Sequence, residues 1–427
     1  MNKFIEILRS WGIQLNPNEK QSKLAEARIA ICDTCEHKKT SPTIHCGVCG
    51  CLLKSKIFSP VENACPEGKW AEVDKSMSKE IKELADQIPE YVPPPVPAME
   101  PAPSSTLKFI CAQPATLYYA WQVEVMISNF LEMGVEPSSI NIVCALDETN
   151  TISNPWFKLI MKYNSVRYYF YPDTRQSKDY VSSIRPNILK QHWERNPDLV
   201  NDAIFYHDCD IVLTRPIKEW ISDTMIQDSN WYGSDCNSYL SHDYIDSKGI
   251  DVLNSVCSIA NIPQETLLAN NYNNIGAQYL LKYITSHFWF DVERDSENLF
   301  RDITAINNLK RQEDPNYDEL QIWCADMWAI LFNGWKMNAN TIVHGNLSFS
   351  WATDDENSWY RNNIFHNAGV VEGNPEFFCK ANYTDKLPYN EPDLYTPGTA
   401  GKKYWELVQQ TGKNSCLLEE CYFSFVI

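Results

Sequence analysis

The stretch AIFYHDCDIVLTRP, residues 203–216, runs from a short apolar strand into two carboxylates and then back into apolar sequence. Three earlier segments have the length and composition of buried strands: Leu107–Gln113, Ile140–Leu146 and Val166–Tyr171. Segments with helical periodicity lie between the strands, at residues 118–133 and 184–194. Apolar strands that alternate with helices predict an α/β fold with a mixed, mainly parallel sheet flanked by helices.

The two carboxylates of this stretch, Asp208 and Asp210, follow the fourth strand directly. If the strand continues through them, residues i and i+2 point the same way and both carboxylates face one site. Paired oxygen ligands at the carboxyl end of a parallel strand suit Mg²⁺ or Mn²⁺ bridging a diphosphate. The alternative is an exposed turn at the strand end, because D-x-D by itself is a short motif.

From about residue 107 to residue 370, the order of these segments resembles that of nucleotide-sugar-dependent glycosyltransferases of the GT-A (Rossmann-like) fold, in which a D-x-D motif binds the metal. The resemblance lies in pattern and order rather than in close identity. It implies that Asp208 and Asp210 hold Mn²⁺ or Mg²⁺ against the diphosphate of a UDP- or GDP-sugar. It also implies that His366, in IFHNAG, completes the metal shell, and that the acceptor is a hydroxyl compound, which the sequence does not identify.

The same resemblance implies donor-binding roles at five further positions. They are Gln113 at the end of the first strand, Arg185 in SIRPNILKQHW, and Gly276, Ala277 and Gln278 in NNIGAQYLL. In the last segment, small residues would let the donor sugar approach the backbone before a helix, predicted over residues 276–284, begins. Each position also has an ordinary structural interpretation: a loop glutamine, a charge at a helix start, a plain helix N-terminus and, for His366, a buried core histidine.

Asp326, in IWCADMWAILF, interrupts an apolar segment that predicts a helix over residues 320–332. A carboxylate among apolar side chains is costly unless it is paired or takes part in the chemistry. The resemblance implies a general base that deprotonates the acceptor hydroxyl if the enzyme inverts. If it retains, Asp326 would only position substrate. The alternative is an acid on the exposed face of the helix.

Six of the 15 cysteines lie between Cys32 and Cys65. Cys32-x-x-Cys35 and Cys46-x-x-Cys49 have the spacing of a structural four-thiolate zinc site, in which Cys51 or Cys65 could replace one ligand. A disulfide framework is the alternative. The arrangement ICDTC…CGVCGCLLKSK…CPEGKW resembles the zinc ribbons at the N-termini of tailed-bacteriophage proteins. It implies a phage-encoded enzyme that docks on a virion protein, active in the host cytoplasm or carried in the virion.

Composition shifts predict four parts of the chain. Residues 1–75 form a helical lead, with helices at 4–14 and 19–31, followed by a zinc-ribbon domain. A Pro-rich linker follows at 76–106, and a glycosyltransferase-like domain at 107–375. The last part is a C-terminal extension at 376–427, with a helix at 402–410. The linker contains YVPPPVPAMEPAPSS, a composition typical of an extended spacer.

The chain has 37 basic and 55 acidic residues and a formal charge of −18, which argues against non-specific binding to nucleic acid or to a membrane surface. We find no signal-peptide cleavage site and no apolar run of about 18 residues, so secretion and membrane insertion are not expected. The resemblance implies a metal-dependent glycosyltransferase of the hexosyltransferase type. The alternative is a virion structural or interaction protein that uses the same scaffold without turnover.

Overall fold

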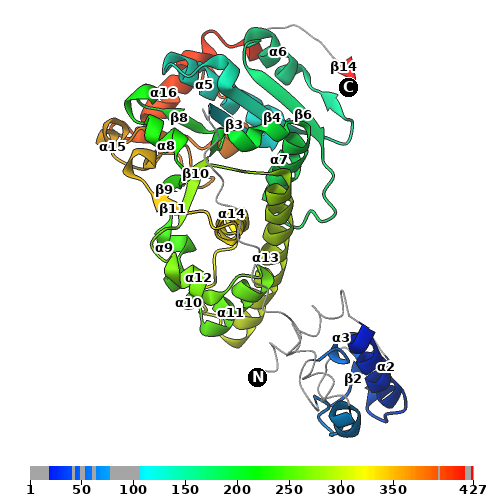
Figure 1. Ribbon diagram of the computed structural model, residues 1–427. Helices are drawn as coiled ribbons and strands as arrows, with labels where there is room; N and C mark the ends of the chain where they lie inside the picture. Colours follow the sequence, from blue (N-terminus) through cyan, green and yellow to red (C-terminus); the bar gives the residue numbers. More distant parts are fainter. Residues whose placement is uncertain are drawn as a thin grey trace. The chain divides into compact units, whose positions relative to one another are not determined.

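The computed structural model describes residues 19–40, 44–48, 53–59, 64–76, 106–392, 395–418 and 425–426 (Figure 1). The chain divides into two compact units, Met1–Ala98 and Met99–Ile427. The division falls inside the predicted linker, but its Pro-rich stretch and the helix predicted at residues 4–14 lie outside the described residues. No helix in the described ranges is long and apolar enough to cross a bilayer.

A seven-stranded sheet forms the centre of the second unit, with the strand order β11-β9-β10-β7-β3-β4-β6. Its strands are β3 (Leu107–Pro114), β4 (Ile140–Leu146), β6 (Arg167–Pro172), β7 (Ala203–His207), β9 (Trp231–Asp235), β10 (Ile275–Leu281) and β11 (Thr341–Val343). β7, β3, β4 and β6 run parallel to one another, whereas β10 is antiparallel to both β7 and β9. The predicted mixed, mainly parallel sheet is confirmed.

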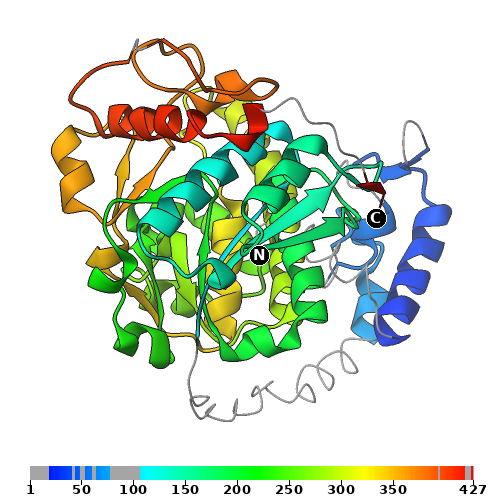
Figure 2. The same cartoon turned by 90° about the horizontal axis from the view of Figure 1, so that it is seen from above.

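Helices cover both faces of this sheet (Figures 1 and 2). On one side lie α5 (Leu117–Glu132), α6 (Asn154–Lys162) and α16 (Ala400–Gly412). On the other side, α7 (Ile184–Arg195) packs on β3 and β4. Helix α13 (Ser286–Glu313) contacts α7 and also α14 (Ala325–Lys336). Because helices cover both faces, β3, β4 and β7 are largely buried, which explains their mainly apolar sequence.

Shorter elements complete this unit. They are α8 (Asp223–Gln227), α9 (Asn237–Leu240), α10 (His242–Asp246), α11 (Ile250–Ile259), α12 (Gln264–Ala269), α15 (Glu356–Arg361) and the paired strands β5 (Thr151–Ile152) and β14 (Phe425–Val426). The residues after 375 belong to the same core, because Phe378, Tyr383 and Tyr404 are buried in it. The predicted C-terminal extension is therefore packed against the sheet unit, and its helix at 402–410 is confirmed as part of α16.

A small second sheet connects distant parts of the chain. Its order is β12 (Phe349–Trp351), β13 (Ile364–His366) and β8 (Ile211–Leu213). β13 runs antiparallel to β8 and places His366 opposite Ile211. The backbone N–H of Asn367 also donates to the carbonyl of Asp210 at 3.0 Å. This pairing brings the end of β13 to the acidic stretch that follows β7.

The helix predicted over residues 276–284 is wrong, because this segment is strand β10. Its side chains are apolar at almost every position, so periodicity could not distinguish a buried strand from a buried helix. The segment is a strand because it pairs with β7 on one side and with β9 on the other. The pairing with β9 has an irregularity in register between Gly276 and Tyr279.

The first unit is small. Its elements include α2 (Glu19–Asp33), α3 (Leu53–Lys56) and a hairpin of β1 (Lys38–Lys39) and β2 (His45–Cys46). Its buried apolar residues, among those described, are Leu24, Ala25, Cys32, Leu53, Ile57 and Trp70. Beside Trp70, the guanidinium of Arg28 donates to Asp74 at 2.8 Å. The predicted helix at 19–31 is confirmed as part of α2.

Candidate metal and ligand-binding site

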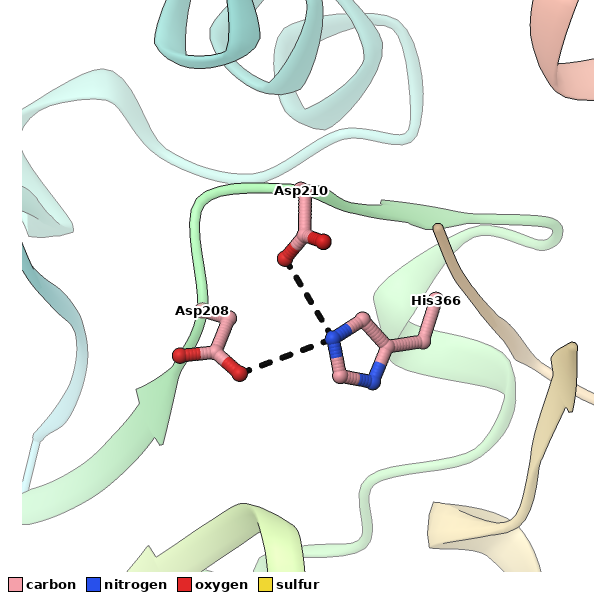
Figure 3. Close-up of side chains that lie close together, drawn as sticks. All are labelled: Asp208, Asp210 and His366. Carbon is pink, nitrogen blue, oxygen red and sulfur yellow. Dashed lines mark ion pairs between the residues drawn. The ribbon is translucent and has the colours of Figure 1, made fainter. Parts of the chain in front are cut away.

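Asp208, Asp210 and His366 come together at the carboxyl end of β7 (Figure 3). Nε2 of His366 lies 3.5 Å from Oδ2 of Asp208 and 3.3 Å from Oδ1 of Asp210. Within the described ranges, this is the one group of at least three His, Cys, Asp or Glu side chains whose candidate ligand atoms all lie within 4.8 Å of one another. Two carboxylates and one imidazole are a donor set that fits Mn²⁺ or Mg²⁺.

The two carboxylates converge for a different reason than the sequence argument gave. Residues 208–210 form a turn between β7 and β8, so strand alternation does not apply to them. The turn is not an exposed one, because Asp210 is only 4% exposed. His366 is 7% exposed, and its Nδ1 has no hydrogen-bond partner among the described residues.

Lys380, the first residue of the 3-10 turn η6 (Lys380–Tyr383), contacts Oδ2 of Asp210 with its ammonium. Burial by itself raises the pKa of the Asp210 carboxyl, but the charges of Lys380 and His366 outweigh burial and lower the pKa below its ordinary value. Burial lowers the pKa of Lys380, and Asp210 more than reverses this effect. The ion pair therefore keeps the buried carboxylate ionised.

Arg185 lies at the second position of α7 and connects two acids. Its Nη1 is 2.7 Å from Oδ1 of Asp208, and its Nη2 is 2.8 Å from Oδ2 of Asp326. These partners are 23 and 141 positions away in the sequence. The predicted donor-binding arginine is thus placed between the metal-site carboxylate and the predicted base.

Asp326 lies in the first turn of α14, where the helix dipole favours a negative charge. The residue is 5% exposed, so the alternative of an acid on the exposed face is wrong. Oδ1 accepts a hydrogen bond of 2.6 Å from the hydroxyl of Tyr180, and Oδ2 is held by Arg185. Burial and the neighbouring Asp326 raise the pKa of Tyr180, which therefore stays protonated and can donate.

Two cavities meet at this cluster and share Ser182, Arg185 and Asp208 in their walls. The smaller cavity, of about 180 Å³, is also lined by Gln113, Tyr118, Tyr119, Asp210 and Lys380. Nε2 of Gln113 donates to the carbonyl of Val143 at 3.2 Å, while its buried Oε1 has no partner among the described residues. Gln113 thus lines the smaller cavity and has a buried acceptor without a partner among the described residues.

The larger cavity, of about 350 Å³, has Arg185 and Asp208 in its wall as well. Its lining includes Asp326, His366 and Ala277. Ala277 has a φ of 58°, in the left-handed region, at the irregularity in β10. At Gly276 a Cβ would lie only 2.3 Å from Cε of Met327, so no side chain fits there without a shift.

Gln278 is not placed as a sugar ligand would be. Its side chain is fully buried, and its Oε1 accepts a hydrogen bond from Ser234 at 3.1 Å. Sequence reasoning also missed two residues of the site, Lys380 and Tyr180. Both lie in segments without a motif, and the single signal for each is its position in the fold.

The predicted zinc ligands lie in the first unit. Cys32, Cys35 and Cys46 line one small cavity of about 20 Å³ together with Cys65, and all four thiols are free. Within the described ranges, no three of these sulfur atoms approach to within 4.8 Å of one another. Cys49 and Cys51 lie outside the described residues.

No family model and no curated protein matches this chain. Similar solved structures include apo WbbM, a bifunctional glycosyltransferase, with 8% identity and a TM-score of 0.39 over 74% of this chain; the alignment spans about half (53%) of WbbM. The galactosyltransferase LgtC with donor and acceptor sugar analogs has 12% identity and a TM-score of 0.33, over 71% of this chain and 95% of LgtC. Apo mouse xyloside xylosyltransferase 1 has 9% identity and a TM-score of 0.30, over 62% of this chain and 97% of the xylosyltransferase chain. These sequence identities and TM-scores are too low to carry a functional argument, so the function is argued from the residues of the site.

Proposed function

We propose that this chain is a metal-dependent glycosyltransferase of the GT-A type, which transfers a sugar from a nucleoside-diphosphate donor to a hydroxyl acceptor. The observation that carries the proposal is the position of Asp208, Asp210 and His366 where two cavities of different character meet. A glycosyl transfer site needs a place for the nucleotide and a place for the sugars, with the metal site between them.

The smaller cavity suits the nucleoside diphosphate. The unpartnered Oε1 of Gln113 can accept a hydrogen bond from a base N–H, and Tyr118 and Tyr119 offer aromatic surface beside it. Lys380 can turn from Asp210 to a phosphate oxygen, since its side chain is 30% exposed. Asp208, Asp210 and His366 would hold Mn²⁺ or Mg²⁺, which when bound stabilises the charge that develops on the leaving diphosphate.

Arg185 and Asp326 act on the sugar side of the metal site. Arg185 adds a fixed positive charge where negative charge develops, and Asp326 and Asp208 hold its guanidinium in place. Both oxygens of Asp326 are engaged by Arg185 and Tyr180. Asp326 can therefore serve as the base of an inverting reaction only after exchanging a partner for the acceptor hydroxyl, whereas its role in positioning Arg185 is available in either stereochemical course.

Calorimetric titration of UDP and GDP into the full-length protein, with and without Mn²⁺, tests the proposal. We expect one nucleotide to bind in a manganese-dependent way, and the double variant Asp208→Ala, Asp210→Ala to weaken this binding by at least 100-fold. Asp246→Ala is the control, because Asp246 is an exposed acid on α10. If neither nucleotide binds to the wild-type protein, the second reading, a structural or interaction protein on the same scaffold, replaces the enzyme.

We further propose that the first unit binds one structural Zn²⁺ through Cys32, Cys35 and Cys46, with Cys65 or Cys49 as the fourth ligand. The support is the CxxC spacing and the cavity that Cys65 lines together with the other three cysteines. Zinc content after Cys65→Ser and Cys49→Ser decides between the two candidates. A docking role toward a virion protein, and with it a phage origin and cytoplasmic action, belongs to the same proposal.

A further inference from the structure

The larger cavity changes in character between its floor and its mouth. At the floor lie His207 and Tyr279, which are 2% and 3% exposed. Nε2 of His207 and the hydroxyl of Tyr279 have no hydrogen-bond partner among the described residues. At the mouth lie Trp323 and Trp351, which are 58% and 37% exposed.

Each exposed tryptophan is supported on one face by another ring. The ring of Tyr239 stacks on Trp323 with centroids 5.8 Å apart and an angle of 25°. The imidazole of His366 stacks on Trp351 with centroids 6.2 Å apart and an angle of 20°. A residue in the metal site thus forms the support of one of the two indoles.

Hydrogen bonds fix the first of these indoles further. Nε1 of Trp323 donates to Oε1 of Gln321 at 3.2 Å, and the carbonyl of Trp323 accepts from the hydroxyl of Tyr180 at 2.7 Å. Tyr180 is also the residue that binds Asp326. The aromatic surface is therefore held in a defined position relative to the acids of the site, which is what a preorganised ligand platform requires.

From these observations we infer that the acceptor is a saccharide, which packs a sugar ring against Trp323 or Trp351 at the mouth, while the donor sugar occupies the floor. Sugar rings have apolar C–H faces that pack on indoles, and hydroxyl groups that satisfy buried polar atoms such as those of His207 and Tyr279. A lipid chain would place apolar surface against the charges of Arg185 and Asp326, at a high desolvation cost. The inference rests on the proposed glycosyltransferase function and specifies its acceptor.

Saturation-transfer NMR on the full-length protein, with Mn²⁺ and whichever of UDP or GDP binds, tests this inference. The probes are methyl glycosides of the common hexoses, pentoses and N-acetylhexosamines, with lactose, maltose and cellobiose. We expect at least one probe to bind, with the strongest saturation on the protons of one ring face. Trp323→Ala or Trp351→Ala should weaken that probe about tenfold.

Two controls separate this inference from the proposed function. Tyr272→Ala removes another exposed aromatic residue, 77% exposed, and should leave saccharide binding unchanged. Trp323→Phe and Trp351→Phe keep a stacking ring and should restore most of the affinity. If a nucleotide binds but no saccharide does, or if both alanine variants bind the saccharide as the wild type does, the acceptor inference fails alone. If no nucleotide binds, the proposed function fails with it.

Discussion

The thiol cluster of the first unit and the carboxylate–imidazole cluster of the second differ in how the chain brings them together. The thiols come from residues 32–65, in a unit with a handful of buried apolar side chains. The carboxylates come from the turn between β7 and β8 and His366 from the distant strand β13, in a unit with a large core. In the second cluster the chain's own cations, Arg185 and Lys380, already balance the carboxylates.

This difference indicates which role a metal ion would have in each of the two clusters. A small unit has little burial energy of its own, so a metal at the thiols would supply much of its folding free energy. The larger unit folds on its core, so a metal at Asp208 and Asp210 would be needed for ligand binding rather than for folding. Three experiments test this contrast.

Removal of zinc should have the largest effect. Structural zinc contributes about 10–16 kcal/mol of binding free energy at neutral pH in small zinc domains. We expect a zinc chelator to abolish hydrogen-exchange protection in residues 19–76 of the full-length protein and to leave residues 106–392 protected. Cys32→Ser should act in the same way and lose the bound zinc, whereas Cys257→Ser, a single cysteine on α11, should retain it. Protection of residues 19–76 that survives complete removal of metal would contradict the contrast.

Loss of Arg185 should have the next largest effect. Arg185→Ala leaves the buried carboxylate of Asp326 without its cation, and we expect the second unit to lose about 3 kcal/mol of unfolding free energy in denaturant titrations. Adding Asp326→Asn should recover part of this loss, because the uncompensated charge is then gone. Arg301→Ala, which removes an exposed pair with Asp302, serves as the control and should cost less than 1 kcal/mol. Equal losses in the Arg185 and Arg301 variants would show that the chain's cations do not hold this cluster together.

Loss of Lys380 should have the smallest effect, and it should favour the metal. The ammonium of Lys380 and a metal ion compete for Asp210, so Lys380→Ala should strengthen the binding of Mn²⁺ alone by roughly tenfold. Titration of Mn²⁺ followed by electron paramagnetic resonance measures this without nucleotide. Lys386→Ala, an exposed lysine three residues after the turn η6, should leave the affinity as in the wild type. Weaker manganese binding in Lys380→Ala would mean that the lysine supports the metal site.

Local patterns predicted the elements whose sequences allow one interpretation. The apolar strands β3, β4 and β7 and the helices α5, α7 and α16 follow from periodicity and from the polar residues around them. Strand β10 could not be predicted in this way, because a segment that is apolar at almost every position fits a buried strand and a buried helix equally well. Its neighbours β7 and β9 decide its conformation by pairing with it.

The residues of the candidate site also fall into two groups, those that a local sequence pattern identified correctly and those that it did not. Asp208, Asp210 and His366 were chosen from a motif and a resemblance, and the structure places them together. Lys380 was not chosen, because an isolated lysine in a segment without periodicity carries no local signal. Gln278 was chosen for its place in a motif, yet its side chain is fully buried and accepts a hydrogen bond from Ser234.

The sequence by itself determined the alternating α/β pattern, the acidic pair after the fourth strand and the CxxC spacing, because each depends on residues close together in the chain. The tertiary structure decided which charges meet: Arg185 with Asp326 across 141 positions, and Lys380 with Asp210 across 170. It also decided that Trp323 and Trp351 line the same cavity. Such contacts are fixed by strand pairing and by packing between distant segments, and no local pattern specifies them.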